Sequence, residues 1–151
     1  MISAVGDDQL GHELLAFIDE RGVNRNCIAI DTVKSTSTVQ VSLDKSGSAS
    51  YDIVADTAWD NIALTDAIID LVHCSDVLVF GSLICRSAVS LGTLTALVDL
   101  ATFSVFDVNL RAPHYQLESI VELMKQADFI KLNDDEPVSY THLTLPTIYS
   151  V

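Results

Sequence analysis

The alternation of helix and strand patterns between Asp60 and Leu132 constrains the fold of this sequence more than any other feature. Apolar residues recur at helical spacing in segments 64–72, 91–98 and 117–124, and a short apolar run follows each segment, at 77–80, 103–106 and 129–132. Strands that are apolar on both faces and joined by helices indicate a parallel sheet covered on two sides. We therefore predict an α/β, Rossmann-like parallel sheet with helices on both faces.

A smaller β structure is predicted before this region. An amphipathic helix over residues 10–18 ends at Gly22, and a short strand follows at Cys27–Ile30. Segments 38–43 and 49–54 then alternate apolar with polar residues around the turn-forming run 44–47. This pattern predicts a β-hairpin with one solvent-exposed face.

The charge balance excludes several classes of partner. The chain has 151 residues, with 8 Lys and Arg against 21 Asp and Glu, and a net charge of −13. Nucleic acids and anionic membrane surfaces attract basic proteins, so we expect neither as a partner. No apolar run reaches the roughly 18 residues that a membrane helix needs.

The N-terminus and the cysteines suggest the compartment. The first thirteen residues lack the basic and apolar regions of a signal peptide. Cys27, Cys74 and Cys85 form no CxxC motif, and we expect three buried, reduced thiols. Together these features predict a cytoplasmic protein.

The last fifteen residues, 137–151, differ from the rest of the chain. They contain none of its charged residues, two of its prolines and no helical periodicity. One interpretation is an apolar C-terminal strand. We favour another, in which 138–151 is translated sequencing-adaptor read-through and 137–151 is not part of the domain.

Polar residues follow each of the three predicted parallel strands. Gly81-Ser82, Asp107–Arg111 and Lys131–Glu136 begin where the apolar runs end. In an open parallel sheet, ligands bind outside the carboxyl ends of the strands, so these segments should lie on one edge.

The residues at this predicted edge suit phosphate chemistry. Arg111 presents planar donors for phosphate or carboxylate, and Asn109 and Asn133 offer neutral donors and acceptors. Asp134, Asp135 and Glu136 carry oxygens that suit hydrated Mg²⁺. An arginine beside metal-binding oxygens is typical of phosphoryl transfer.

Structural interpretations of the same residues remain open at this point. Asp107 could cap a loop, Lys131 could extend into solvent, and the acidic run 134–136 could be the first turn of a helix. The segment Gly6–Gly11 lacks the GxGxxG spacing and the lysine of a phosphate loop, so we interpret it as a structural turn before the first helix.

The chain resembles the pfkB/ribokinase-type carbohydrate kinases, most closely the bacterial fructokinase branch. The Asp-x-Asn-x-Arg motif at 107–111 and the Asn-x-x-Glu motif at 133–136 occur in order, one crossover apart. The likeness covers residues 4–136, and we interpret 1–136 as a partial, ribokinase-like sugar-kinase domain. The segments that carry it are Val5–Gly11 with the following helix, Thr36–Tyr51, Asp76–Leu83, Phe106–Arg111 and Lys131–Glu136.

The resemblance implies that ATP phosphorylates a small sugar, fructose being the first expectation. It implies that the hairpin over 36–54 is a β-lid above the sugar and a surface for homodimerisation. Asn133 and Glu136 would organise Mg²⁺ and phosphates, with Glu136 as the metal ligand through a water. Asp107, Asn109, Arg111 and Lys131 would lie beside the site and hold phosphate or sugar.

The departures from the family pattern are at the ends. We find neither the first strand nor the Gly/Asn-rich sugar-binding segment that the family has before Gly6. The Gly-Ala-Gly-Asp motif with the catalytic base and the adenine pocket are not found either. We therefore expect an internal piece of a kinase, incomplete at both ends, without a catalytic residue of its own and inactive alone. Alternatives are a kinase for ribose, a nucleoside or a keto-sugar acid, or a non-catalytic module that binds sugar or phosphate or only dimerises.

Overall fold

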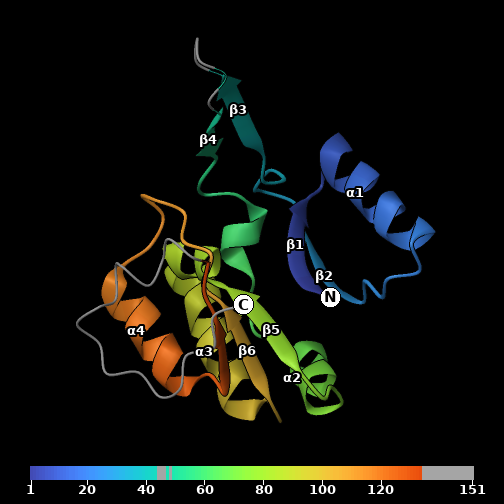
Figure 1. The fold of residues 1–151 in the computed structure, drawn as a ribbon. Coiled ribbons are helices and arrows are strands. Elements are labelled where there is room, and N and C mark those ends of the chain that lie inside the picture. The colour runs from blue at the N-terminus through green and yellow to red at the C-terminus, as the bar shows by residue number, and fades with distance from the viewer. Residues whose placement is uncertain (44–46, 48, 134–151) are drawn as a thin grey trace. The chain divides into compact units, whose positions relative to one another are not determined.

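The computed structural model describes residues 1–43, 47 and 49–133, and these form two compact units, Met1–Ala63 and the described part of Leu64–Val151 (Figure 1). Across the described residues, no helix is long and apolar enough to cross a membrane.

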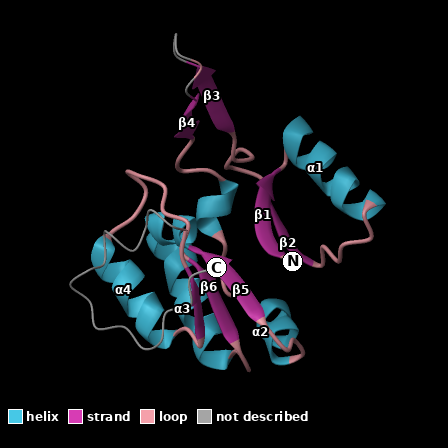
Figure 2. Ribbon diagram, viewed as in Figure 1, coloured by secondary structure: helices cyan, strands magenta, loops and turns pink. Residues whose placement is uncertain are grey.

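The first unit contains a parallel strand pair and a hairpin. Strand β1 (Ile2–Gly6) pairs in parallel with β2 (Cys27–Asp31), and helix α1 (Gln9–Glu20) connects them. Strands β3 (Val39–Leu43) and β4 (Ala49–Ile53) form the predicted antiparallel hairpin, and the short 3₁₀ helix η1 (Ala58–Asn61) follows it (Figure 2). Strand β1 was not predicted, because its five residues contain no apolar run long enough to stand out.

Helix α1 begins and ends where its flanking residues require. The carboxylate of Asp8 accepts a hydrogen bond from the amide of Gly11, 2.8 Å away, and so caps the first turn. Gly22 adopts φ +65°, the left-handed conformation that commonly follows a helix and that glycine tolerates best. The side chains of Leu15 and Ile18, on one face of the helix, are buried.

The second unit is a three-stranded parallel sheet with helical crossovers. Its strands are β5 (Leu78–Gly81), β6 (Ser104–Asp107) and β7 (Phe129–Lys131), in the order β5-β6-β7. Helices α3 (Ala88–Leu100) and α4 (Leu117–Gln126) connect them, α2 (Asp66–His73) precedes β5 and packs against α3, and the 3₁₀ helix η2 (Ser82–Arg86) follows β5. The predicted parallel α/β sheet is confirmed.

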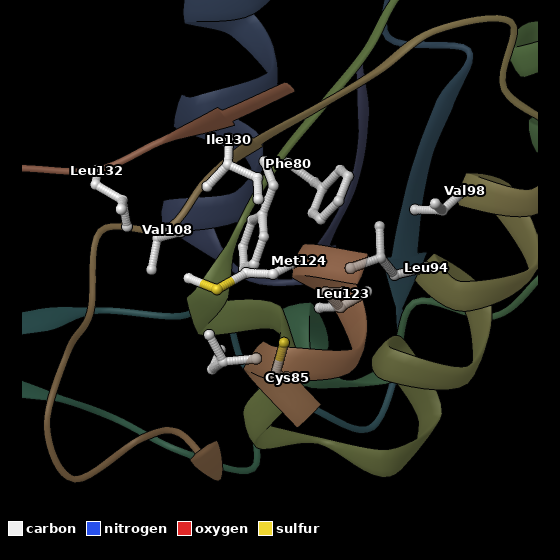
Figure 3. Close-up of a cluster of buried hydrophobic side chains, with 11 residues drawn as sticks. Phe80, Cys85, Leu94, Val98, Val108, Leu123, Met124, Ile130 and Leu132 are labelled. Carbon is white, nitrogen blue, oxygen red and sulfur yellow. The ribbon is translucent and has the colours of Figure 1, made fainter. Parts of the chain in front are cut away.

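One face of this sheet packs on α3 and α4. Phe80, Phe106 and Ile130 occupy one row of the sheet register and belong to a buried cluster with Leu94 and Met124 of these helices (Figure 3). The rings of Phe80 and Phe106 stack with centroids 4.9 Å apart. Because side chains alternate along a strand, the row beside this one points to the opposite face. On that opposite face Val79 is 65% exposed.

Two sequence predictions need correction. Only Cys85 is buried, whereas Cys27 is half-buried and Cys74, just after α2, is exposed. The hairpin is predicted to have only one solvent-exposed face, but Val39 and Val41 on its apolar face are also more than half exposed. Alternation along a strand predicts which residues share a face; it does not predict whether another element covers that face.

Candidate functional site

The carboxyl ends of β5, β6 and β7 lie side by side. Gly81, Asp107 and Lys131 occupy one row of the parallel register. The ladder continues beyond the strands, because the amide of Val108 donates to the carbonyl of Lys131 (3.0 Å) and the amide of Ser82 donates to the carbonyl of Val108 (3.2 Å). We call residues 81–82, 107–111 and 131–133 the strand-end rim.

An ion pair joins two strands of the rim. The ammonium of Lys131 lies 3.0 Å from a carboxylate oxygen of Asp107 on the neighbouring strand. Both side chains are partly exposed, at 46% and 37%. The interpretation that Lys131 only extends into solvent is therefore wrong, and Asp107 holds a lysine rather than capping a loop.

A second set of contacts joins all three loops of the rim. The hydroxyl of Ser82, which is buried, donates to the carbonyl of Asn109 (3.3 Å). The side-chain amide of Asn133 donates to the side-chain carbonyl of Asn109 (3.3 Å). Asn109 has φ +42°, a conformation that asparagine adopts more readily than most residues. The turn at Asn109 therefore brings the loops after β5, β6 and β7 into contact.

Arg111 is a second exposed cation of the rim, beside Lys131. Its guanidinium donates to the carbonyl of Leu110 (3.2 Å), and its own carbonyl accepts from the amide of His114 (2.8 Å) in the following turn. A guanidinium presents several donors in one plane and can bind two oxygens of a phosphate at once. Arg111 and Lys131 therefore give this acidic chain two cations at one edge of the sheet.

The described residues alone do not form a magnesium site. Within residues 1–43, 47 and 49–133, no three acidic, histidine or cysteine side chains gather as ligands would. Asp107 is the one carboxylate of the rim, and Lys131 neutralises it. Asp134, Asp135 and Glu136, to which the sequence assigns the metal, lie outside the described residues, as does the segment 137–151.

The sequence is similar to that of several known proteins. A sequence profile of the pfkB family carbohydrate kinases matches residues 1–148. Fructokinase-2 of Oryza sativa subsp. japonica is 29% identical over 147 residues, which cover 89% of this chain and 43% of the plant protein. A sugar kinase of Pyrococcus horikoshii is 30% identical over 145 residues, covering 90% of this chain and 46% of that protein.

Solved structures show the same fold. The Pyrococcus horikoshii sugar kinase superposes with a TM-score of 0.84 over 93% of this chain and 49% of its own, at 28% identity, and it has also been solved with ATP. Fructokinase from Xylella fastidiosa superposes with a TM-score of 0.82 over 93% of this chain and 47% of its own, at 19% identity. The chain thus spans less than half the length of these relatives. The resemblance drawn from the sequence motifs and the ribokinase-like fold are confirmed.

Proposed function

Because this chain belongs to the pfkB family of carbohydrate kinases, we propose that it carries part of the active site of an ATP-dependent sugar kinase, with fructose as the preferred acceptor. The observation that supports this most is the strand-end rim, where the loops after three parallel strands meet and two cations lie at one edge. A cytoplasmic location is part of the same proposal.

The rim has the chemistry that phosphoryl transfer requires. This reaction depends on positioning the phosphates and on neutralising the charge that develops on them. We assign Arg111 to an oxygen of the transferring phosphoryl group, and Lys131, oriented by Asp107, to a second phosphate oxygen or the sugar. The amides of Asn109 and Asn133 would supply neutral hydrogen bonds beside them.

The metal and the proton transfer involve other residues. Glu136 remains our proposed ligand for Mg²⁺, through a water; the cation would add positive charge near the phosphates. The base that accepts the proton of the sugar hydroxyl belongs to the Gly-Ala-Gly-Asp motif of the family, which these 151 residues do not contain. Loss of a general base alone typically slows a reaction by about 10²–10⁴-fold. We therefore expect the 151-residue chain to show no measurable turnover.

The hairpin is proposed to cover the sugar and to bind a second copy of the chain. Val41 and Tyr51 pair across its strands and are 57% and 65% exposed, and Val39 and Leu43 of β3 are exposed beside them. An exposed apolar surface of this kind is typical of an interface. In sedimentation, Val41→Lys should convert dimers into monomers, whereas Gln40→Lys on the opposite face should not. A monomeric wild-type chain, or equal effects of both changes, would contradict the dimer.

The activity is tested with the protein encoded by the complete reading frame. Release of ADP is measured with fructose, ribose, a nucleoside or a keto-sugar acid as the acceptor. The 151-residue chain, assayed in the same way, is the control. We expect turnover from the complete protein, fastest with fructose, and none from the control. Faster turnover with another acceptor would correct the substrate. Sugar binding without ADP release would replace the kinase with a binding module.

A further inference from the structure

The carboxylate of Asp8 does more than cap a helix. Its Oδ1 accepts from the amide of Gly11 (2.8 Å) and from the hydroxyl of Thr36 (2.7 Å), and its Oδ2 accepts from the amide of Thr36 (2.8 Å). The hydroxyl of Thr36 in turn accepts from the amide of Gly6 (2.9 Å). Two side chains 28 positions apart therefore connect the end of β1, the first turn of α1 and the segment that leads to the hairpin.

Two glycines make room for this network. A Cβ atom at Gly6 would lie 2.6 Å from Oδ2 of Asp8 and 2.6 Å from the amide nitrogen of Thr36. A Cβ atom at Gly11 would lie 2.1 Å from the carbonyl oxygen of Gly6 and 2.8 Å from the hydroxyl of Thr36. No side chain fits at either position without displacing backbone. Gly6 and Gly11 therefore let the end of β1, the first turn of α1 and the segment around Thr36 approach closely enough for these hydrogen bonds.

Thr36 lies at the root of the hairpin, by which we mean segments 31–38 and 54–58. The amide of Ala58 donates to the carbonyl of Ser35 (2.9 Å), and the amide of Val54 donates to the carbonyl of Thr38 (3.1 Å). These two hydrogen bonds join the segment before β3 to the segment after β4. Contacts that fix the position of Thr36 therefore also fix the base of both hairpin strands.

We propose that Asp8 is a positioning residue that fixes the root of the hairpin to the first turn of α1, so that the hairpin moves only beyond Thr38 and Val54. Its role in setting a lid above the sugar rests on the proposed function, whereas the bonding itself does not. A carboxylate suits the task because both of its oxygens accept, and the three donors facing it come from two segments. Charge-assisted bonds of this length are stronger than neutral ones.

The helix cap and the link to Thr36 can be separated by substitution. Asp8→Ser keeps a good capping residue for α1 but cannot accept from both the amide and the hydroxyl of Thr36. Thr36→Val removes the hydroxyl, and Thr36→Ser restores it. Asp7→Ser is the matched control, because the side chain of Asp7 is exposed and hydrogen bonds to His12, outside this network.

Backbone amide exchange of the full 151-residue chain, without ATP or sugar, tests the link. In Asp8→Ser, the amides of Thr36 and Ala58 should exchange about tenfold faster or more, with amides inside α1 unchanged. Thr36→Val should accelerate the same amides and that of Gly6, and Thr36→Ser should restore them. Root amides that exchange as in Asp7→Ser would overturn the proposal. So would equal exchange in Thr36→Val and Thr36→Ser, which decides the question if Asp8→Ser does not fold.

A kinetic measurement tests the role of the Asp8–Thr36 hydrogen bonds in sugar binding separately from the proposed kinase activity. In the complete kinase, Asp8→Ser should raise KM for the sugar more than it lowers kcat, because a misplaced lid weakens sugar binding first. If the amides of the hairpin root exchange faster in Asp8→Ser but the KM for the sugar is unchanged, Asp8 fixes the root but does not position a lid. Absence of kinase activity in the wild type would refute the proposed function and leave the exchange result intact.

Discussion

The ammonium of Lys131 and the carboxylate of Asp107 lie 3.0 Å apart at the carboxyl ends of neighbouring parallel strands. This contact requires the register in which the two residues stand directly opposite each other. It leaves Lys131 oriented along the rim rather than extended into solvent. The pair therefore links the sheet to the site proposed at its edge.

The Asp107–Lys131 pair should matter little for stability. Both side chains are partly exposed, and exposed ion pairs contribute about 0–1 kcal/mol. A double-mutant cycle with Asp107→Asn and Lys131→Met, measured by urea unfolding, should give a coupling within that range. The exposed pair of Lys125 and Glu122 is the control. A coupling above about 2 kcal/mol would mean that the pair is structural rather than a feature of the site.

The stacked aromatic pair should dominate the core of the second unit. Phe106 is fully buried and stacks on Phe80. Phe106→Ala should reduce the free energy of unfolding by about 3–5 kcal/mol, because it removes buried surface and leaves a cavity. Phe103→Ala is the control, since Phe103 is 41% exposed and should tolerate the change far better. Equal losses in the two variants, measured by urea unfolding, would contradict this packing.

The cysteines should differ in reactivity. Burial raises the pKa of the Cys85 thiol to about 11, whereas Cys74 is exposed. Because the thiolate is the reactive form, an alkylating reagent at pH 8 should modify Cys74 rapidly and spare Cys85 until the protein unfolds. Mass spectrometry of the wild type and of Cys74→Ser would check this. Modification of Cys85 at the rate of Cys74 in the folded chain would contradict its burial.

Acid should destabilise the first unit through two aspartates. Backbone hydrogen bonds from Thr36 and Gly11 hold the pKa of Asp8 below its ordinary value of 3.8, and those from Lys34 and Val33 do the same for the pKa of Asp31. His12 and Lys34 are the nearby charges that act in the same direction.

A carboxyl group with a lowered pKa in the folded state stabilises the fold above its unfolded pKa, and this stability is lost as the pH falls through the folded value. Urea midpoints should therefore be steady above about pH 5 and decline below pH 3.8. Asp8→Ser should flatten part of this decline, and Asp7→Ser should not. Identical acid profiles in wild type and Asp8→Ser would exclude Asp8 as the source.

Much of the fold could be predicted from the sequence because helix and strand periodicities are local. The three helices and the strand after each of them were predicted, including the two crossovers α3 and α4. The strand-end rule anticipated that the segments beginning at Gly81, Asp107 and Lys131 would share one edge. The Asp107–Lys131 contact could not be predicted, since it depends on register across two strands. The link between Asp8 and Thr36 spans 28 positions and has no periodic signal.

Arg111 provides the most direct test of the proposed site. In the protein encoded by the complete reading frame, Arg111→Ala should remove about 2–4 kcal/mol of transition-state stabilisation, which lowers kcat/KM with ATP and fructose by roughly 30- to 1000-fold. Stability should change little, because the side chain is exposed. Arg25→Ala, which removes an arginine paired with Asp19 in the first unit, is the control and should retain wild-type activity. An unchanged kcat/KM in Arg111→Ala would contradict the assignment of the strand-end rim to phosphoryl transfer.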